Sequence, residues 1–155
     1  MAEKTLILVH TFDGKFDDVY EHISNLKKFG EIHPYMSQVN AITAAPDISC
    51  TLYHIKETVT LMGILKINPE YEAEVLSIKS KKKVSYFSII KYPFTSITLK
   101  INFDFLENNS NESLLVKEQI ILRGNALLIA YFASILEKAH LQTFDNLKKK
   151  LKTNK

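Results

Sequence analysis

The sequence predicts an α+β fold in which an antiparallel sheet of about seven strands curls around one long carboxyl-terminal helix. Residues 37–123 divide into short strands separated by turn signals, and residues 125–150 have the pattern of a single long helix. Helices do not alternate with the strands, which argues against a parallel βαβ arrangement. The sheet needs a cover for its apolar face, and the last helix is the only large element that can supply it.

The amino-terminal part predicts one strand followed by two short helical segments. "TLILVHTF" (Thr5–Phe12) is rich in β-formers, and "DDVYEHISNLKKFG" places its apolar residues at helical spacing. Asp17 or Asp18 favours the start of this helix, and Gly30 is expected to end it. Pro34 disfavours helix at the residue before it, so "EIHPYM" is expected to form at most a short second helical turn.

The middle of the chain predicts the strands of the sheet. "SQVNAITA" and "SCTLYHIKETVTL" are separated by the turn signal "APD", and "ILKI" and "YEAEVLSI" lie on either side of "NPE". "VSYFSII" follows. "TSITLKINFDFLE" alternates apolar and polar residues, which is typical of a half-buried antiparallel strand. "NNSNE" is expected to be a hairpin loop, and "SLLVKEQIILR" the last strand.

The final helix, "NALLIAYFASILEKAHLQTFDNLKKKL", differs between its two halves. Asn125 is the expected N-cap, and the second half carries one apolar stripe. The first half is apolar on nearly every side, so it is buried on more than one side or it binds something apolar. Its candidate pocket or mouth residues are Leu128, Tyr131, Phe132 and Ile135. The alternatives are a solid core without a cavity and a dimer contact.

Two glutamates are predicted to point to the same apolar interior. Glu118 shares a strand face with Leu, Val and Ile residues, and Glu57 shares one with Tyr53. A buried carboxylate must be paired, hydrogen-bonded or protonated, and desolvation disfavours its ionised form unless a cation is close. Tyr53 and Tyr86 could donate hydrogen bonds to Glu118 from neighbouring strands, although both faces of the strand that carries Tyr86 are partly apolar and its direction is left open. Such a carboxyl group can bind a ligand's polar end or act as a general acid or base, whereas the alternative is a purely structural acid.

Composition limits the class of protein. A chain of 155 residues with 46% apolar and 24% charged residues is expected to form one soluble domain over residues 1–155. Cys50 is the only cysteine, which excludes an intrachain disulfide, and no helical zinc motif, phosphate loop or dinucleotide fingerprint occurs. No metal and no cofactor are therefore expected. The chain lacks a long apolar run and a convincing signal peptide, which favours a cytoplasmic location.

The net charge of +3 hides two lysine clusters, "KSKKK" and the tail "KKKLKTNK". They hold nine of the 20 basic residues and none of the 17 acidic residues, so the rest of the chain is acidic. These clusters are expected to be a solvated turn and a solvated helix end, with a weak contact to an anionic membrane surface as the alternative. A single arginine, and no aromatic residues among the lysines, argue against nucleic acid as a partner.

Three segments resemble the START-like superfamily, which includes polyketide cyclases and dehydratases, lipid-transport domains and the birch-pollen-allergen group. They are "HTFDGKFDDVYEHISNLKKFGEIHPYM", "YHIKETVTLMG" with its central glutamate, and "RGNALLIAYFASILEKAHLQTFDNLKKKL". The resemblance covers nearly the whole chain. It implies the helix-grip fold, with an internal pocket between the curved sheet and the last helix.

The resemblance and the apolar patterns together predict binding, or transport, of a hydrophobic small molecule or lipid. The expected ligand-binding residues are Glu57, Glu118, Tyr53, Phe103, Leu128, Tyr131, Phe132 and Ile135. One alternative is a cyclase or dehydratase enzyme that uses the same pocket. The other is an interaction module whose apolar helix half binds another chain. The protein is expected to be a monomer or a dimer.

Overall fold

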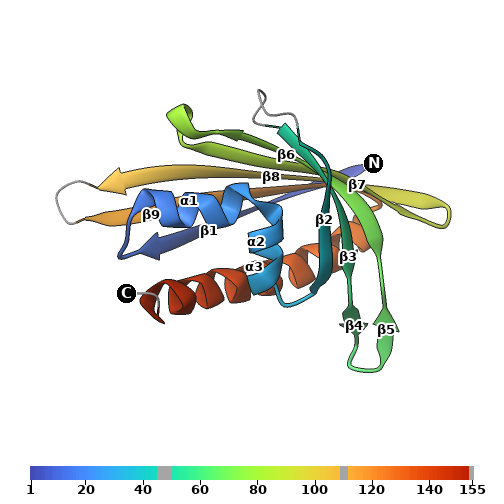
Figure 1. Cartoon of the computed structure of the whole chain (residues 1–155). Helices are drawn as coiled ribbons and strands as arrows, with labels where there is room; N and C mark the ends of the chain where they lie inside the picture. Colours follow the sequence, from blue (N-terminus) through green and yellow to red (C-terminus); the bar gives the residue numbers. More distant parts are fainter. Residues whose placement is uncertain (45–49, 109–111, 154–155) are drawn as a thin grey trace.

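The structure is a computed structural model that describes residues 1–44, 50–108 and 112–153. One strand, two short helices, a run of strands and one long helix follow each other in the predicted order (Figure 1). Their bounds are β1 (Ala2–Phe12), α1 (Phe16–Ser24), α2 (Leu26–Ile32), β2 (Met36–Ala44), β3 (Cys50–Glu57), β4 (Val59–Leu61), β5 (Leu65–Ile67), β6 (Glu70–Ile78), the short 3₁₀ turn η1 (Lys79–Lys81), β7 (Lys83–Tyr92), β8 (Thr95–Asn108), β9 (Ser113–Gly124) and α3 (Ala126–Thr153).

Seven of these strands form one antiparallel sheet in the order β1-β9-β8-β7-β6-β3-β2. Figure 1 shows the sheet bending around α3, and α2 packs against that helix, where the side chain of Asn146 donates to the carbonyl of Ile32 (2.9 Å). The predicted α+β helix-grip architecture is therefore confirmed. The alternation in β8 is confirmed as well, since its inward-facing side chains are all buried: Ile97, Leu99, Ile101, Phe103 and Phe105.

The predicted strand "SCTLYHIKETVTL" is in fact two strands. β3 ends at Glu57, and the backbone N–H of Thr58 donates to the carbonyl of Tyr35 (2.8 Å), one residue beyond the last pair of the β2–β3 ladder. The chain then enters β4, which pairs only with β5 in a separate two-stranded hairpin. The predicted turn "APD" and the centre of the predicted loop "NNSNE" fall at residues 45–49 and 109–111, outside the described residues.

The first helical segment also differs from its prediction. The helix breaks at Asn25, whose backbone is extended and whose side-chain oxygen accepts hydrogen bonds from the N–H groups of Lys27 and Lys28. Asn25 thereby caps α2, and Gly30 lies inside that helix instead of ending it. A Cβ atom at Gly30 would come within 2.6 Å of a methyl group of Val39, so the close packing of α2 on β2 explains the glycine.

The cap of α3 is confirmed, because the side chain of Asn125 accepts hydrogen bonds from the N–H groups of Leu127 (3.0 Å) and Leu128 (3.3 Å). The carboxyl-terminal half of the helix presents its apolar stripe to the core, where Phe144 and Leu147 are 1% exposed. Leu127 on the first turn is 84% exposed. The two ends of α3 therefore have different environments.

This contrast predicts effects of very different size for a leucine-to-alanine substitution at the two ends of α3. Leu147→Ala should lower the free energy of unfolding by about 2–5 kcal/mol, because it leaves a cavity in the core. Leu127→Ala should change it by less than about 0.5 kcal/mol, because that side chain is in solvent. Urea denaturation followed by circular dichroism measures both. Equal effects would show that the carboxyl-terminal half of α3 is not packed as described.

Candidate functional site

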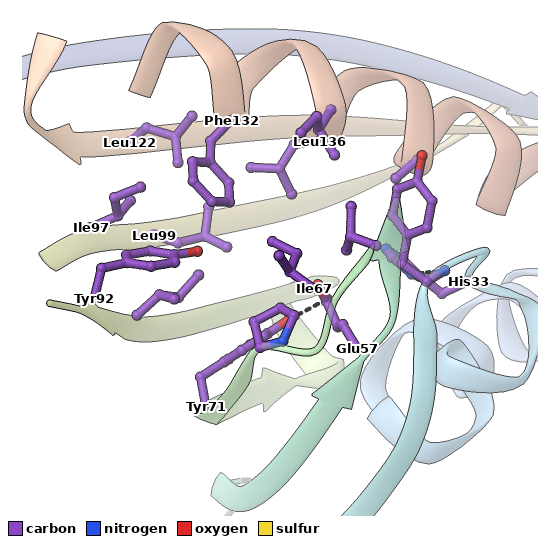
Figure 2. A pocket seen from close by; sticks show the side chains of 16 residues that line it. His33, Glu57, Ile67, Tyr71, Tyr92, Ile97, Leu99, Leu122, Phe132 and Leu136 are labelled. Carbon is purple, nitrogen blue, oxygen red and sulfur yellow. Dashed lines mark hydrogen bonds between the residues drawn. The ribbon is translucent and has the colours of Figure 1, made fainter. Parts of the chain in front are cut away.

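A cavity lies between the sheet and the middle of α3 (Figure 2). It has about 40 Å³ of space for the centres of water molecules, and about 610 Å³ in total when its open mouth is included. The smaller of these two volumes is enough for a few ordered water molecules. The walls are mostly apolar and consist of His33, Tyr35, Glu57, Val59, Ile67, Pro69, Tyr71, Ile90, Tyr92, Ile97, Leu99, Leu122, Phe132, Ile135, Leu136 and Ala139.

A carboxyl group and a phenol are paired on one wall of the cavity. The hydroxyl of Tyr71 on β6 donates to Oε1 of Glu57 at the end of β3, at 2.5 Å (Figure 2). Burial raises the pKa of Glu57, and the hydrogen bond from Tyr71 opposes this only in part. Burial, followed by the proximity of Glu57, raises the pKa of Tyr71 well above its usual value. The pair therefore favours a protonated phenol beside a carboxyl group that resists ionisation.

Tyr92 at the end of β7 is another phenol of the cavity wall. Its ring packs on Phe132 of α3, with ring centroids 5.5 Å apart. Burial raises the pKa of Tyr92 to about 12, and the negative charge of Glu57 adds to this shift. Within the described part of the chain, its hydroxyl oxygen is buried and has no hydrogen-bond partner.

His33, between α2 and β2, also lines the cavity. Its Nδ1 accepts hydrogen bonds from the backbone N–H groups of Tyr35 (3.1 Å) and Met36 (3.3 Å), so that nitrogen carries no proton. Burial lowers the pKa of His33 to about 3, and repulsion from His140 contributes to the shift. The imidazole is therefore neutral near neutral pH.

A second polar cluster lies in the core and is formed by Glu118, His10 and His140. Nε2 of His10 on β1 is 2.9 Å from Oε2 of Glu118 on β9, and Nδ1 of His140 on α3 is hydrogen-bonded to Oε1. The ring of His10 stacks on Phe144, with centroids 3.6 Å apart. Glu118 is completely buried, and neither histidine is more than 3% exposed.

The charge state of Glu118 follows from these contacts. Burial alone would raise its pKa, but the attraction of His140 and the hydrogen bonds from His10 and His140 outweigh burial, so the pKa is lowered. A carboxylate only accepts hydrogen bonds, hence both ring nitrogens must donate to it. The cluster thus ties β1, β9 and α3 together through one buried anion.

The prediction of the hydrogen-bond donors to Glu118 was wrong. Tyr53 and Tyr86 were predicted, whereas the structure places His10 and His140 there. The hydroxyl of Tyr86 instead donates to the backbone carbonyl of Ile23 in α1, at 2.5 Å. The sequence could not reveal this, because His10 is 108 residues away from Glu118 and their contact depends on the β1–β9 register.

The structure divides the predicted ligand-binding residues into three groups. Glu57, Phe132 and Ile135 line the cavity. Glu118, Tyr53 and Phe103 are buried in the core beyond its walls. Leu128 and Tyr131 border a shallow surface hollow on the amino-terminal turns of α3, with Thr95, Asn125 and Leu127.

The sequence analysis did not single out Tyr71, Tyr92 or His33 as cavity residues. Tyr71 begins a strand whose inward face also carries Ala73 and Val75, so the alternation of β6 was a usable signal. Tyr92 precedes a turn, and His33 lies between α2 and β2. No periodic pattern indicates where such residues point.

Two turns beside the cavity carry exposed apolar side chains. The β4–β5 turn holds Met62 and Ile64, which are 81% and 87% exposed, and the β7–β8 turn holds the fully exposed Phe94. Val59 and Ile67 of the hairpin, and Tyr92 beside Phe94, line the cavity itself. The strands around the cavity are thus joined by turns with solvent-exposed apolar tips.

The lysine cluster of residues 79–83 is largely ion-paired. Three ammonium nitrogens lie close to carboxylate oxygens. The distances from Nζ are 3.0 Å for Lys79 to Oδ1 of Asp17, 2.5 Å for Lys82 to Oε1 of Glu107 and 3.4 Å for Lys83 to Oδ1 of Asp104. These exposed pairs contribute little stability, but they neutralise part of the cluster's charge.

Two kinds of feature are missing from the part of the chain that the structure describes. No group of three or more His, Cys, Asp and Glu side chains there is arranged to hold a metal ion. None of its helices is long and apolar enough to cross a membrane.

Comparison with known proteins identifies the fold. No protein-family model matches the sequence, and no curated protein matches it significantly. Among solved structures, the aromatase/cyclase Zhui from Streptomyces sp. R1128 is 8% identical, with a TM-score of 0.77 over 96% of this chain and 93% of that one. A START superfamily protein from Mycobacterium smegmatis is 8% identical, with a TM-score of 0.68 over 97% and 99%. This chain has a START-like fold.

The di-domain aromatase/cyclase StfQ from the steffimycin biosynthetic pathway is also similar. It is 14% identical, with a TM-score of 0.75, and the match covers 95% of this chain but 50% of StfQ. At such low identities the similarity concerns the START-like fold alone. The chemistry of this protein must therefore be argued from its own cavity.

The buried carboxylate predicts a large effect for Glu118→Gln. The substitution keeps the shape but removes the charge that receives both imidazole N–H groups. It should lower the free energy of unfolding by about 2 kcal/mol, since hydrogen bonds to charged groups are the strong ones. Glu3→Gln is the matched control, because Glu3 pairs with Arg123 at the surface, and it should cost less than about 1 kcal/mol. A Glu118→Gln protein as stable as the parent in chemical denaturation would contradict an ionised Glu118.

The neutral, buried His33 predicts a loss of stability in acid. As the pH falls below 6.5, His33 in the unfolded chain binds a proton that the folded protein refuses until about pH 3. Stability due to this residue is therefore present above 6.5, and it decreases by about 1.4 kcal/mol per pH unit below that value. His33→Asn keeps an acceptor for the two backbone N–H groups and should remove this slope between about pH 6 and 4.

The control for this prediction is His54→Asn. His54 is partly exposed beside Glu70, so this substitution removes a histidine without disturbing the backbone hydrogen bonds that His33 accepts. Denaturant titrations at several pH values give the slopes directly. Parallel curves for the parent and His33→Asn would show that His33 is protonated in the folded protein.

Proposed function

We propose that this protein binds a hydrophobic small molecule or lipid in the cavity between the sheet and α3. The observation that supports this most directly is the composition of the cavity wall. Ile90, Ile97, Leu99, Leu122 and Phe132 supply an apolar surface, and a few polar groups lie among them. Ligand sites commonly combine an apolar wall with a small number of placed polar groups.

The first half of α3 supports the proposal as well. Phe132, Ile135 and Leu136 are only partly buried although they face the sheet, because the cavity lies between them and the strands. A large apolar side chain next to a cavity loses packing contacts that a solid core would give it. A bound apolar molecule would restore those packing contacts, and this gain would favour binding.

A second candidate function is catalysis of the cyclase or dehydratase type. The observation that favours it is the Glu57–Tyr71 pair, since a carboxyl group with a raised pKa on a cavity wall can act as a general acid. In this mechanism Glu57 would protonate a substrate oxygen and Tyr71 would stabilise the resulting carboxylate. The aromatase/cyclases with a similar fold make this reaction class reasonable to test.

Filling the cavity should abolish binding. The chain has no tryptophan, so Ile135→Trp adds bulk to the cavity wall, whereas Leu141→Trp adds the same side chain at an exposed position of α3. We expect Ile135→Trp to weaken binding of the neutral fluorescent probe N-phenyl-1-naphthylamine by roughly tenfold or more, because overpacking an occupied site is costly. Leu141→Trp should bind the probe like the parent.

Native mass spectrometry of the purified protein gives an independent measurement. A co-purifying apolar molecule that is present in the parent and in Leu141→Trp, but absent from Ile135→Trp, would support the binding function. If the parent binds no probe and carries no ligand, the proposal is wrong. Chemical conversion of a bound molecule that stops in Glu57→Gln while binding persists would favour the enzyme.

A further inference from the structure

The polar groups of the cavity point to a narrower class of ligand. Building on the proposed binding function, we propose that the cavity selects an uncharged ligand. Its apolar body would carry one hydrogen-bonding group, a hydroxyl or a carbonyl, that binds the hydroxyl of Tyr92.

The first argument is the unused hydrogen bond of Tyr92. Its hydroxyl oxygen is buried, yet within the described residues it has no partner. Figure 2 shows Tyr92 at the side of the cavity with this oxygen directed toward the interior. Buried polar groups almost always have a partner, because an unpaired one retains its full desolvation cost. A ligand oxygen placed in the cavity would supply the missing partner.

The second argument is that the neighbouring polar groups are already engaged. Glu57 accepts the hydrogen bond of Tyr71, and Nδ1 of His33 accepts those of two backbone N–H groups. Among the fully buried side-chain nitrogen and oxygen atoms of the described residues, the Tyr92 hydroxyl is the one without a hydrogen-bond partner. Because burial and Glu57 hold its pKa near 12, its hydroxyl stays protonated and can donate to a carbonyl or hydroxyl oxygen.

The third argument is charge. Among the described residues that line the cavity, none is a lysine or an arginine. An anionic head group would lose its hydration without gaining a cation, and it would also face Glu57. Glu57 would then have to remain protonated, or it would repel the ligand. A carboxylate ligand such as a fatty acid anion is therefore disfavoured, whereas an alcohol, ketone or amide of similar shape is not.

A cationic ligand is the competing possibility, because Glu57 could pair with it. The geometry is unfavourable, since Glu57 is already bonded to Tyr71 and its burial opposes ionisation. A neutral ligand avoids both costs. A cationic probe, 2-naphthylmethylammonium, tests the competing case.

The test uses probes that share one apolar body and differ in one group. Naphthalene, 2-naphthamide, 2-naphthoate and 2-naphthylmethylammonium are titrated into the protein near neutral pH by isothermal titration calorimetry. We expect 2-naphthamide to bind roughly tenfold or more tightly than either charged probe, because the charged groups lose hydration without compensation. The amide and the carboxylate have nearly the same shape, so their difference isolates charge.

Two variants locate the effect. Tyr92→Phe should weaken binding of 2-naphthamide by about fivefold, the value of one hydrogen bond, while naphthalene binding stays unchanged. Tyr20→Phe also removes a phenolic hydroxyl, but Tyr20 is buried beside Phe16 and Phe105 outside the cavity, so all affinities should remain. Glu57→Gln should reduce the discrimination against 2-naphthoate, because it removes the acid that the anion must face.

The outcomes separate this inference from the function on which it rests. If the probes bind with equal affinity, or if a charged probe binds best, the cavity binds apolar molecules but the inference is wrong. The inference is also wrong if Tyr92→Phe behaves like Tyr20→Phe. If no probe binds, the proposed function fails and the inference fails with it.

Discussion

The fold depends on one buried interaction, the carboxylate of Glu118 held between His10 and His140. These residues come from β9, β1 and α3, so the interaction fixes the long helix against two strands of the sheet. The desolvation free energy of the buried carboxylate is high, because a charge removed from water must be compensated by hydrogen bonds and by opposite charge. Once formed, the interaction allows little sliding of α3, since a shift would leave the anion unpaired. The stacking of His10 on Phe144 then joins the polar cluster to the aromatic core.

This anchor explains how one helix serves two purposes. Beyond His140, α3 packs on the core through Phe144 and Leu147, and the interior there is filled. Before His140, Phe132 and Ile135 face a space that the sheet does not fill. A helix held firmly at one half can leave a cavity beneath the other half, because the well-packed half supplies the stability that the cavity costs.

The two interior glutamates, Glu118 in the histidine cluster and Glu57 beside Tyr71, differ in the direction of their pKa shifts. Glu118 has two donors with basic nitrogens, and its pKa is lowered, so it is a structural anion. Glu57 has one phenolic donor, and its pKa is raised. The difference arises from the partners, because the two imidazole donors of Glu118 outweigh the effect of its burial, whereas the single phenolic donor of Glu57 opposes burial only in part. The proposed ligand contacts are therefore at Glu57, Tyr71 and Tyr92, whereas Glu118 fixes the helix that covers the cavity.

The sequence alone determined the order of the elements, the alternation of β8, the cap at Asn125 and the inward direction of Glu118, because each depends on local periodicity or on a neighbouring residue. It did not determine the break at Asn25, where the close packing of α2 on β2 decides how Gly30 is used. Nor did it reveal the partners of Glu118 or the position of Tyr92. His10 and Glu118 are brought together by strand register across most of the chain, and the cavity exists only where α3 and the curved sheet fail to meet. Local patterns record which face a residue takes, but distances between faces are set by the packing of the whole chain.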